Sequence, residues 1–203
     1  MANGKWQTVE YKMNLQNQDK LLKHLEDAKQ IAEPLRRRIF IVAILTEALK
    51  PNLIRPILVG GGAVEFYTFG GYATADVDLV ISNRKLLGQV LEKLNFIPDG
   101  RFWYREDLNI VIECPDEVLA GDLDRVFEVE IKGMICAIIG IEDLIVDRLN
   151  SYVYWSYEDD KRWVSQLIAS QGSHLDMDYL RSRLDEDKIR QAFERILDEI
   201  QTD

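Results

Sequence analysis

The sequence predicts an α+β fold, with a mixed sheet between about residues 53 and 140 and helices on either side of it. Near both ends of the chain, apolar residues recur every three to four positions, which is the spacing of amphipathic helices. Between them, short apolar runs alternate with turn residues, which is the pattern of strands in an α+β core. We therefore predict N-terminal helices over 1–52, the core over 53–140 and a helical C-terminal region over 141–203.

The predicted elements follow one another along the chain with recognisable ends. Pro34 suits the first turn of the second helix, and Pro51 ends that helix. Lys132 and Gly133 predict the turn of a hairpin, and Pro115 predicts the end of a strand. The helices are predicted at 19–32, 34–49, 63–69, 84–94, 141–155, 158–170 and from 186 onward, and the strands at 56–59, 76–82, 101–104, 108–114, 125–131 and 134–139.

Composition narrows the class of protein. No apolar run approaches the ~20 residues that span a bilayer, and residues 1–6 lack the apolar stretch of a signal peptide, so we expect a cytoplasmic protein without membrane contact. The net charge of −10 disfavours general DNA binding, because such binding relies on Lys and Arg neutralising phosphates. The basic run Arg36-Arg37-Arg38 is interpreted as a solvated helix face.

Asp76 and Asp78 are the first candidates for a chemical role. Side chains alternate along a strand, so the two carboxylates share one face, roughly 6.6 Å apart at ~3.3 Å per residue. Ionised carboxylates this close repel each other, and a divalent cation such as Mg²⁺ removes the penalty, because hard cations bind carboxylate oxygens. A solvated edge strand is the alternative interpretation.

Three glycines, Gly60, Gly61 and Gly62, precede this strand and lie between an apolar strand and the start of a helix. Glycine lets the backbone approach a phosphate closely, and the free amides at a helix N-terminus attract the anion. A phosphate-binding turn and a metal-binding strand are therefore neighbours in the sequence, and a nucleoside triphosphate bound through Mg²⁺ needs both.

Residues 59–64 (VGGGAV) and 74–79 (TADVDL) together resemble the signature of the polymerase-β-like nucleotidyltransferase superfamily. The glycine motif is similar to that of tRNA CCA-adding enzymes. The whole chain is more similar to small bacterial nucleotidyltransferase-like proteins, some related to the AbiEii toxin group, in which a segment like residues 140–149 opens the helical C-terminal part. The resemblance implies a nucleotidyltransferase-type mixed sheet flanked by helices, and an NTP such as ATP bound at Gly60, Gly61, Gly62 and Thr74.

The resemblance also implies a third carboxylate on a neighbouring strand. Glu113 is the best match, although the family more often has Asp there, and Glu128 and Glu130 stay open as alternatives. Two Mg²⁺ ions would be held by Asp76, Asp78 and Glu113, and Glu113 or a nearby water would accept the proton of the acceptor hydroxyl.

Departures from the family pattern limit the specific activity. The CCA-adding enzymes have an Arg-Asp pair where Glu65 and Phe66 stand here, so CCA addition is not expected; Glu65 is interpreted as a favourable acid in a helix's first turn. Trp103 and Tyr104 are candidates for stacking a base, although core packing is the favoured interpretation. The aromatic residues between 152 and 157 either line a substrate cleft or, as favoured here, pack between the two halves of the chain.

Two functions from different classes follow. The first is an active transferase that moves a nucleotide from an NTP to a hydroxyl on a protein, an RNA or a small molecule. The second is a catalytically silent protein of the same fold that binds a partner protein, such as a toxin–antitoxin component. Three plausible carboxylates favour the first, and the absence of an obvious acceptor-binding domain keeps the second open.

Overall fold

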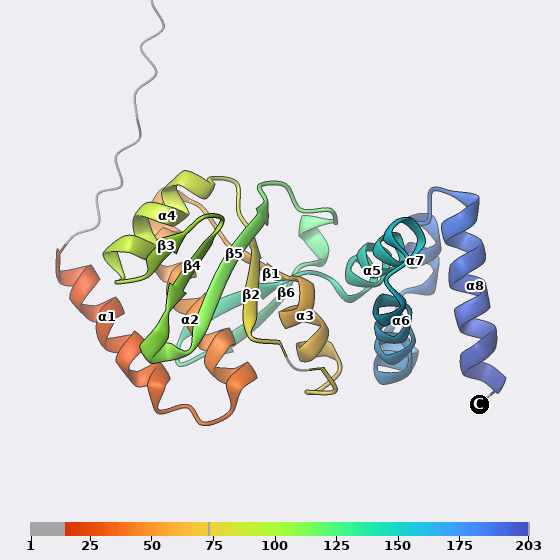
Figure 1. The fold of residues 1–203 in the computed structure, drawn as a ribbon, viewed down its shortest axis with the longest axis horizontal. Coiled ribbons are helices and arrows are strands. Elements are labelled where there is room, and N and C mark those ends of the chain that lie inside the picture. The colour runs from red at the N-terminus through yellow and green to blue at the C-terminus, as the bar shows by residue number, and fades with distance from the viewer. Residues whose placement is uncertain (1–14, 73, 203) are drawn as a thin grey trace, which may run out of the picture.

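The structure, a computed structural model, describes residues 15–72 and 74–202 (Figure 1). The expectations drawn from residues 1–6 lie outside this part. Seven strands form one mixed sheet in the order β3-β4-β5-β2-β1-β7-β6, which confirms the predicted α+β fold. The strands are β1 (Ile57–Val59), β2 (Asp76–Val80), β3 (Ile97–Asp99), β4 (Phe102–Arg105), β5 (Ile110–Asp116), β6 (Phe127–Ile131) and β7 (Met134–Ile138).

Helices precede and follow the strands along the chain, as predicted. In Figure 1 the last four helices, α5 to α8, form a lobe beside α3. Within the described residues, none of the helices is both long enough and apolar enough to cross a bilayer. The predicted domain boundaries after residues 52 and 140 stay predictions. The helices are α1 (Leu15–Lys29), α2 (Pro34–Leu49), α3 (Gly60–Tyr67), α4 (Arg84–Lys93), α5 (Ile141–Trp155), α6 (Glu158–Gln171), α7 (Met177–Ser182) and α8 (Asp187–Thr202).

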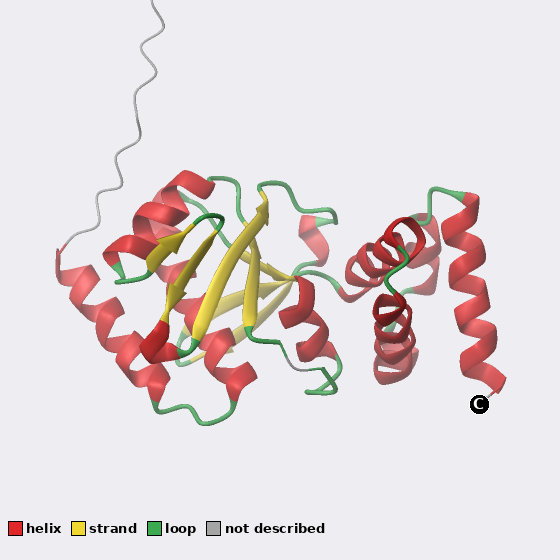
Figure 2. Cartoon of the chain, in the orientation of Figure 1, coloured by secondary structure: helices red, strands yellow, loops and turns green. Residues whose placement is uncertain are grey.

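The two faces of the sheet differ in burial, and Figure 2 shows the strands between the helices. Val77 and Leu79 of β2 are fully buried, and Trp103 of β4 packs against Gly88 of α4. Asp76 and Asp78, which alternate with Val77 and Leu79 along β2, lie on the opposite and more open face. The period-two alternation thus places the apolar side chains under helices and leaves the acidic side chains accessible.

Several elements depart from their predicted ends by a few residues, and two were missed. The third helix begins at Gly60 rather than residue 63, and β5 runs through Pro115 to Asp116. The register between β2 and β5 shifts between Asp78 and Val80, and a proline without an N–H is tolerated at such a bulge. The missed elements are β3 and α7, which have three and six residues and are too short to show a period.

The basic run at 36–38 is only partly a solvated face, which corrects the sequence interpretation. Arg38 is buried, and its guanidinium forms an ion pair with the buried Glu65 of α3. Glu65 also accepts the Thr74 N–H at 3.2 Å, so it connects α2 to the segment that precedes β2. The sequence interpretation of Glu65 as an acid in a helix's first turn was therefore wrong. Glu65 is the sixth residue of α3, and its partner Arg38 is 27 positions away in sequence.

Removal of the Arg38 side chain is expected to destabilise the protein strongly. Arg38→Ala leaves the Glu65 carboxylate buried and unpaired, so we expect the free energy of unfolding to fall by about 3–5 kcal/mol. Arg36 on the same helix is exposed, and Arg36→Ala should change that free energy by less than about 0.5 kcal/mol. Urea unfolding of both variants measures this, and equal losses would show that the Arg38–Glu65 pair does not matter for stability.

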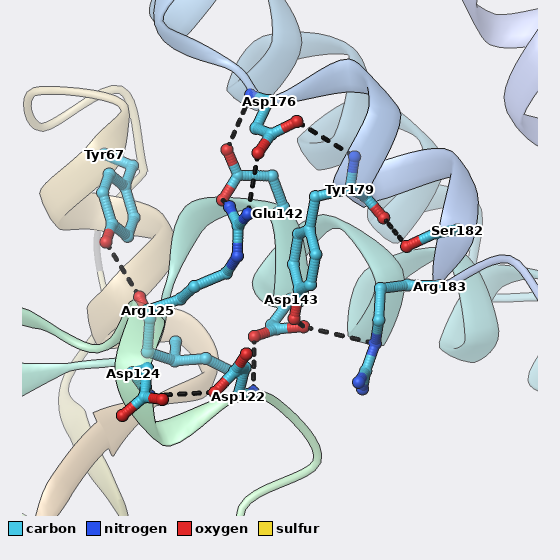
Figure 3. Close-up of polar contacts among 11 residues, drawn as sticks. Tyr67, Asp122, Asp124, Arg125, Glu142, Asp143, Asp176, Tyr179, Ser182 and Arg183 are labelled. Atoms are coloured by element: carbon cyan, nitrogen blue, oxygen red, sulfur yellow. Dashed lines mark hydrogen bonds and ion pairs between the residues drawn. The ribbon is translucent and has the colours of Figure 1, made fainter.

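A cluster of hydrogen bonds and ion pairs connects the C-terminal helices to the loop after β5 (Figure 3). The fully buried Asp143 carboxylate accepts the Asp122 N–H at 2.8 Å and the Tyr179 hydroxyl at 2.9 Å. Arg125 from the same loop pairs with Asp176 at 2.7 Å and lies over the Tyr179 ring. Burial and the bond to Asp143 raise the pKa of Tyr179 to about 12, so its hydroxyl remains a donor at neutral pH.

Candidate functional site

The strand pairing places Glu113 directly beside Asp78. Strands β2 and β5 run parallel, with Asp78 opposite Glu113 and Asp76 opposite Val111. Residues paired across neighbouring strands point to the same face, so Asp76, Asp78 and Glu113 share the open face of the sheet. Glu128 and Glu130, the alternatives to Glu113, lie on the edge strand β6, three strands away from β2. Their distance from Asp78 leaves Glu113 as the nearer of the candidate third carboxylates.

The Asp78 carboxylate is largely buried and has other negatively charged side chains nearby. Burial raises its pKa, and the charges of Glu113 and Asp76 raise it further. The Gly61 N–H donates to this carboxylate, and the guanidinium of Arg148 lies near enough to offset part of the repulsion. The ionised form of Asp78 is therefore disfavoured without a cation, which is the condition under which a divalent ion binds well.

Glu113 has a partner of its own. Its carboxylate forms an ion pair with Arg101 at 3.1 Å, and Arg101 is largely exposed. In the described part of the chain, no group of three or more His, Cys, Asp or Glu side chains is arranged to hold one metal ion. Asp76, Asp78 and Glu113 are thus neighbours on one face of the sheet, but they do not form a closed set of ligands in this arrangement.

The glycine turn brings α3 against β2. Gly60 adopts a left-handed backbone with φ of +58°, and a Cβ atom there would stand 2.2 Å from the Asp78 Oδ2 atom. A Cβ at Gly61 would stand 2.8 Å from the Tyr72 ring and 3.3 Å from Thr74. The absence of side chains at Gly60 and Gly61 therefore permits the contact between the helix start, the Asp78 carboxylate and the segment before β2.

A cleft of about 730 Å³ opens where the glycine turn and β2 meet the helical lobe. It contains three of the predicted nucleotide-site residues, Gly60, Gly61 and Thr74, together with Asp76 and Asp78. Its other wall comes from α5, α6 and the turn between them, and its residues there are Arg148, Ser156, Tyr157, Glu158, Asp159, Asp160, Arg162 and Trp163. Sequence reasoning missed this wall, although the aromatic run near residue 155 was one signal for it.

Arg148 is the main basic group between the carboxylates and the helical lobe. It lies on α5, and its guanidinium pairs with Asp147 at 2.6 Å and with Asp160 at 3.1 Å. Asp160 also accepts the Ser151 hydroxyl. Two carboxylates thus hold the Arg148 guanidinium in place near Asp78, and the pKa of Arg148 is raised because these carboxylates outweigh the effect of burial.

A family model described as "Nucleotidyltransferase of unknown function (DUF6036)" matches residues 38–200, which include the glycine turn, all three carboxylates and most of the helical lobe. The chain belongs to this nucleotidyltransferase family. A comparison with curated proteins finds no match.

A solved structure of another nucleotidyltransferase-like protein resembles this family member in fold. An antigenic nucleotidyltransferase-like protein from Paracoccidioides brasiliensis has a TM-score of 0.57 and 16% sequence identity, over 80% of this chain and 88% of that one. The antibiotic-resistance factor ANT(2'')-Ia has a TM-score of 0.44 and 14% identity, over 83% and 92% of the two chains. At such identities, the first likeness supports the fold alone.

The aromatic candidates of this family member separate into two groups. Trp103 is buried against α4, as the favoured core interpretation stated. Trp155 and Tyr157 are 72% and 59% exposed, so the favoured interpretation that they pack between the two halves was wrong. Tyr157 lines the cleft instead, as does Trp163, which packs edge-to-face on Tyr72 with ring centroids 4.4 Å apart.

The two glycine positions of the turn are expected to respond differently to a β-branched side chain. Gly61 lies in ordinary helical backbone, so Gly61→Val should lose less stability than Gly60→Val, although its Cβ would displace the Tyr72 ring. It should weaken nucleotide binding at least tenfold, because the new side chain enters the cleft. Gly60→Val should lose stability as well, because a left-handed backbone strains a β-branched residue. Melting curves and nucleotide titrations separate the two effects. If Gly61→Val melts as far below wild type as Gly60→Val, the glycines are mainly structural.

Proposed function

We propose that this protein transfers a nucleotide from a nucleoside triphosphate to a hydroxyl acceptor. The observation that carries the proposal is the cleft in which Asp76 and Asp78 stand beside the glycine turn, with Glu113 in register with Asp78 on the next strand. Its volume of about 730 Å³ lies within the range of roughly 300–1,000 Å³ that is usual for small-ligand sites. The family description supports the class of reaction, and the cleft supports these residues as its site.

The superfamily implies Mg²⁺ ions at these carboxylates, and the donor chemistry fits them. Asp76, Asp78 and Glu113 offer oxygen ligands, and burial first and the charge of Glu113 second raise the pKa of Asp78, so a bound cation would stabilise its carboxylate. Glu113 would exchange its contact with Arg101 for the ion. When bound, the ions would neutralise the triphosphate and lower the pKa of the acceptor hydroxyl.

The residues of the chain itself would position the reactants. The N-terminus of α3 and the Thr74 hydroxyl face the cleft and would bind phosphate oxygens, with Arg148 as a cationic partner. The exposed parts of Tyr72, Tyr157 and Trp163 offer aromatic surface for a base. Binding both ends of the nucleotide would fix the α-phosphate near Asp76 and Asp78, and such positioning supplies most of the catalysis in phosphoryl transfer.

The proposed transfer is a single displacement. The acceptor oxygen forms a bond to the α-phosphorus, the bond from that phosphorus to the bridging oxygen of the β-phosphate breaks, and pyrophosphate leaves. The hydroxyl proton passes to Glu113 or to a water beside it. The balanced products are pyrophosphate and a nucleotidylated acceptor.

Labelled nucleotides test the proposed reaction directly. The protein is incubated with Mg²⁺, a cell extract and each of the four NTPs, labelled on either the α- or the γ-phosphate. The proposal expects the α-label on an acceptor and the γ-label in pyrophosphate, both lost in the Asp78→Asn variant. Transfer of the γ-label to an acceptor would show a kinase instead. Nucleotide or partner binding without any transfer would support the catalytically silent alternative.

A further inference from the structure

A second cleft lies beside the first one at Asp78. It has a volume of about 370 Å³ and shares Gly60, Asp78 and Arg148 with the larger cleft. Asp78 therefore lies between the two clefts, so a hydroxyl at the Asp78 end of the second cleft would be close to a phosphate at the Asp78 end of the first. The loop after β5 forms much of its remaining wall.

The wall of the second cleft is mostly apolar. The loop that carries part of it is held at both ends. The Asp116 carboxylate accepts the N–H groups of Glu117 and Val118 at 2.7 and 3.1 Å, and Asp143 accepts the Asp122 N–H within the cluster of Figure 3. A loop fixed in this way presents a preformed surface. The larger apolar lining residues are Val59, Val80, Pro115, Val118, Leu119 and Ile139.

The charges around the second cleft disfavour the binding of a polyanion. Three carboxylates, of Asp78, Asp116 and Asp147, line it, and Arg148 is the one basic side chain among its lining residues. The Arg148 guanidinium is already paired with Asp147 and Asp160. Arg148 is also the group proposed above to meet the triphosphate, so an RNA backbone in the second cleft would meet net negative charge without a further cationic side chain to neutralise its phosphates. The small volume also sets a limit on the size of the acceptor group.

We propose that the second cleft binds the acceptor, and that the acceptor is a small neutral or cationic alcohol with an apolar body. This inference rests on the proposed nucleotidyl transfer and specifies its acceptor. The apolar walls would bind the body of the alcohol, the carboxylates would tolerate or attract a positive charge, and the hydroxyl would point to the junction at Asp78. The reaction is the displacement described above, with this hydroxyl as the nucleophile.

A cell extract is first separated into protein, RNA and small molecules, and the small molecules are divided by ion exchange into anionic and non-anionic fractions. Each fraction is then incubated separately with the protein, Mg²⁺ and α-labelled NTPs. The inference expects a labelled product when the non-anionic small-molecule fraction supplies the acceptor. Label on RNA, protein or an anionic small molecule would overturn it while leaving the proposed function intact. Nucleotide binding without label in any fraction would overturn both the inference and the proposed transfer. Failure to bind any NTP would instead overturn the proposed function.

Variants connect the result to the cleft. Ala120 is an exposed lining residue, so Ala120→Trp should fill the cleft and lower transfer at least tenfold, with unchanged calorimetric binding of Mg²⁺-NTP as evidence of a folded protein. Ala169→Trp, at an exposed position of α6, should retain full transfer. Val118→Arg adds a cation to the wall at a side chain that is 73% exposed, and should shift the preference toward anionic acceptors. Unchanged transfer in both cleft variants would overturn the assignment.

Discussion

Replacement of both Asp76 and Asp78 by asparagine is expected to abolish Mg²⁺-dependent nucleotide binding and to leave the fold intact. The two carboxylates are the proposed metal ligands on β2, and an amide oxygen without charge binds Mg²⁺ far more weakly. The folded protein should not melt lower, because burial and the charges of its neighbours raise the pKa of Asp78, which means that its negative charge does not stabilise the fold. Calorimetric titration with each Mg²⁺-NTP measures binding, and circular dichroism measures the fold.

Asp99→Asn is the control for this double variant. Asp99 is exposed on the edge strand β3 and lines neither of the clefts described above, so its replacement should leave nucleotide binding unchanged. Equal metal-dependent binding by wild type and the double variant would show that the nucleotide site does not use these carboxylates.

Glu113→Gln is expected to lower turnover by about 10²- to 10⁴-fold, with a much smaller loss of nucleotide affinity. A residue that accepts the proton of the acceptor hydroxyl acts mainly in the transition state, and general bases contribute rate factors of that order. Triphosphate would still bind through Asp76, Asp78 and the amides at the start of α3. Steady-state kinetics, with kcat and KM determined separately, provides the measurement.

The matched control replaces the acids that the sequence left open as alternatives. Glu128 and Glu130 lie on β6, and Glu128 pairs with Arg55 rather than facing β2. Glu128→Gln and Glu130→Gln should therefore keep turnover within about twofold of wild type. A large loss in either control together with a normal Glu113→Gln enzyme would move the third carboxylate to β6.

The sequence predicted the sheet half of the candidate site well, for a physical reason. The alternation in β2 places Asp76 and Asp78 on one face wherever that strand lies, and the glycines mark a turn that requires a missing Cβ. The neighbouring position of Glu113 came from the family resemblance rather than from any local pattern. That position depends on which strand pairs with β2, and the alternation of residues within one strand does not predict its pairing partner.

The helical wall of the cleft could not be predicted in the same way. Arg148 and Trp163 reach the glycine turn only because α5 and α6 pack beside α3, more than 80 positions later in the chain. Likewise, Arg38 belongs to a run of three arginines that resembles a solvated face, and only the packing of α2 on α3 shows its buried partner Glu65. Charge patterning identifies the type of residue at a surface, whereas the partner of a buried charge depends on tertiary packing.

A crystal structure with Mn²⁺ and an NTP analogue that resists cleavage between the α- and β-phosphates tests the central claim most directly. Mn²⁺ replaces Mg²⁺ at oxygen ligands and is located by its anomalous scattering. We expect the metal signal at Asp76 and Asp78, with Glu113 turned from Arg101 toward it and the phosphates at the N-terminus of α3. Phosphates bound elsewhere, or a bound nucleotide with no metal at Asp76 and Asp78, would contradict the account.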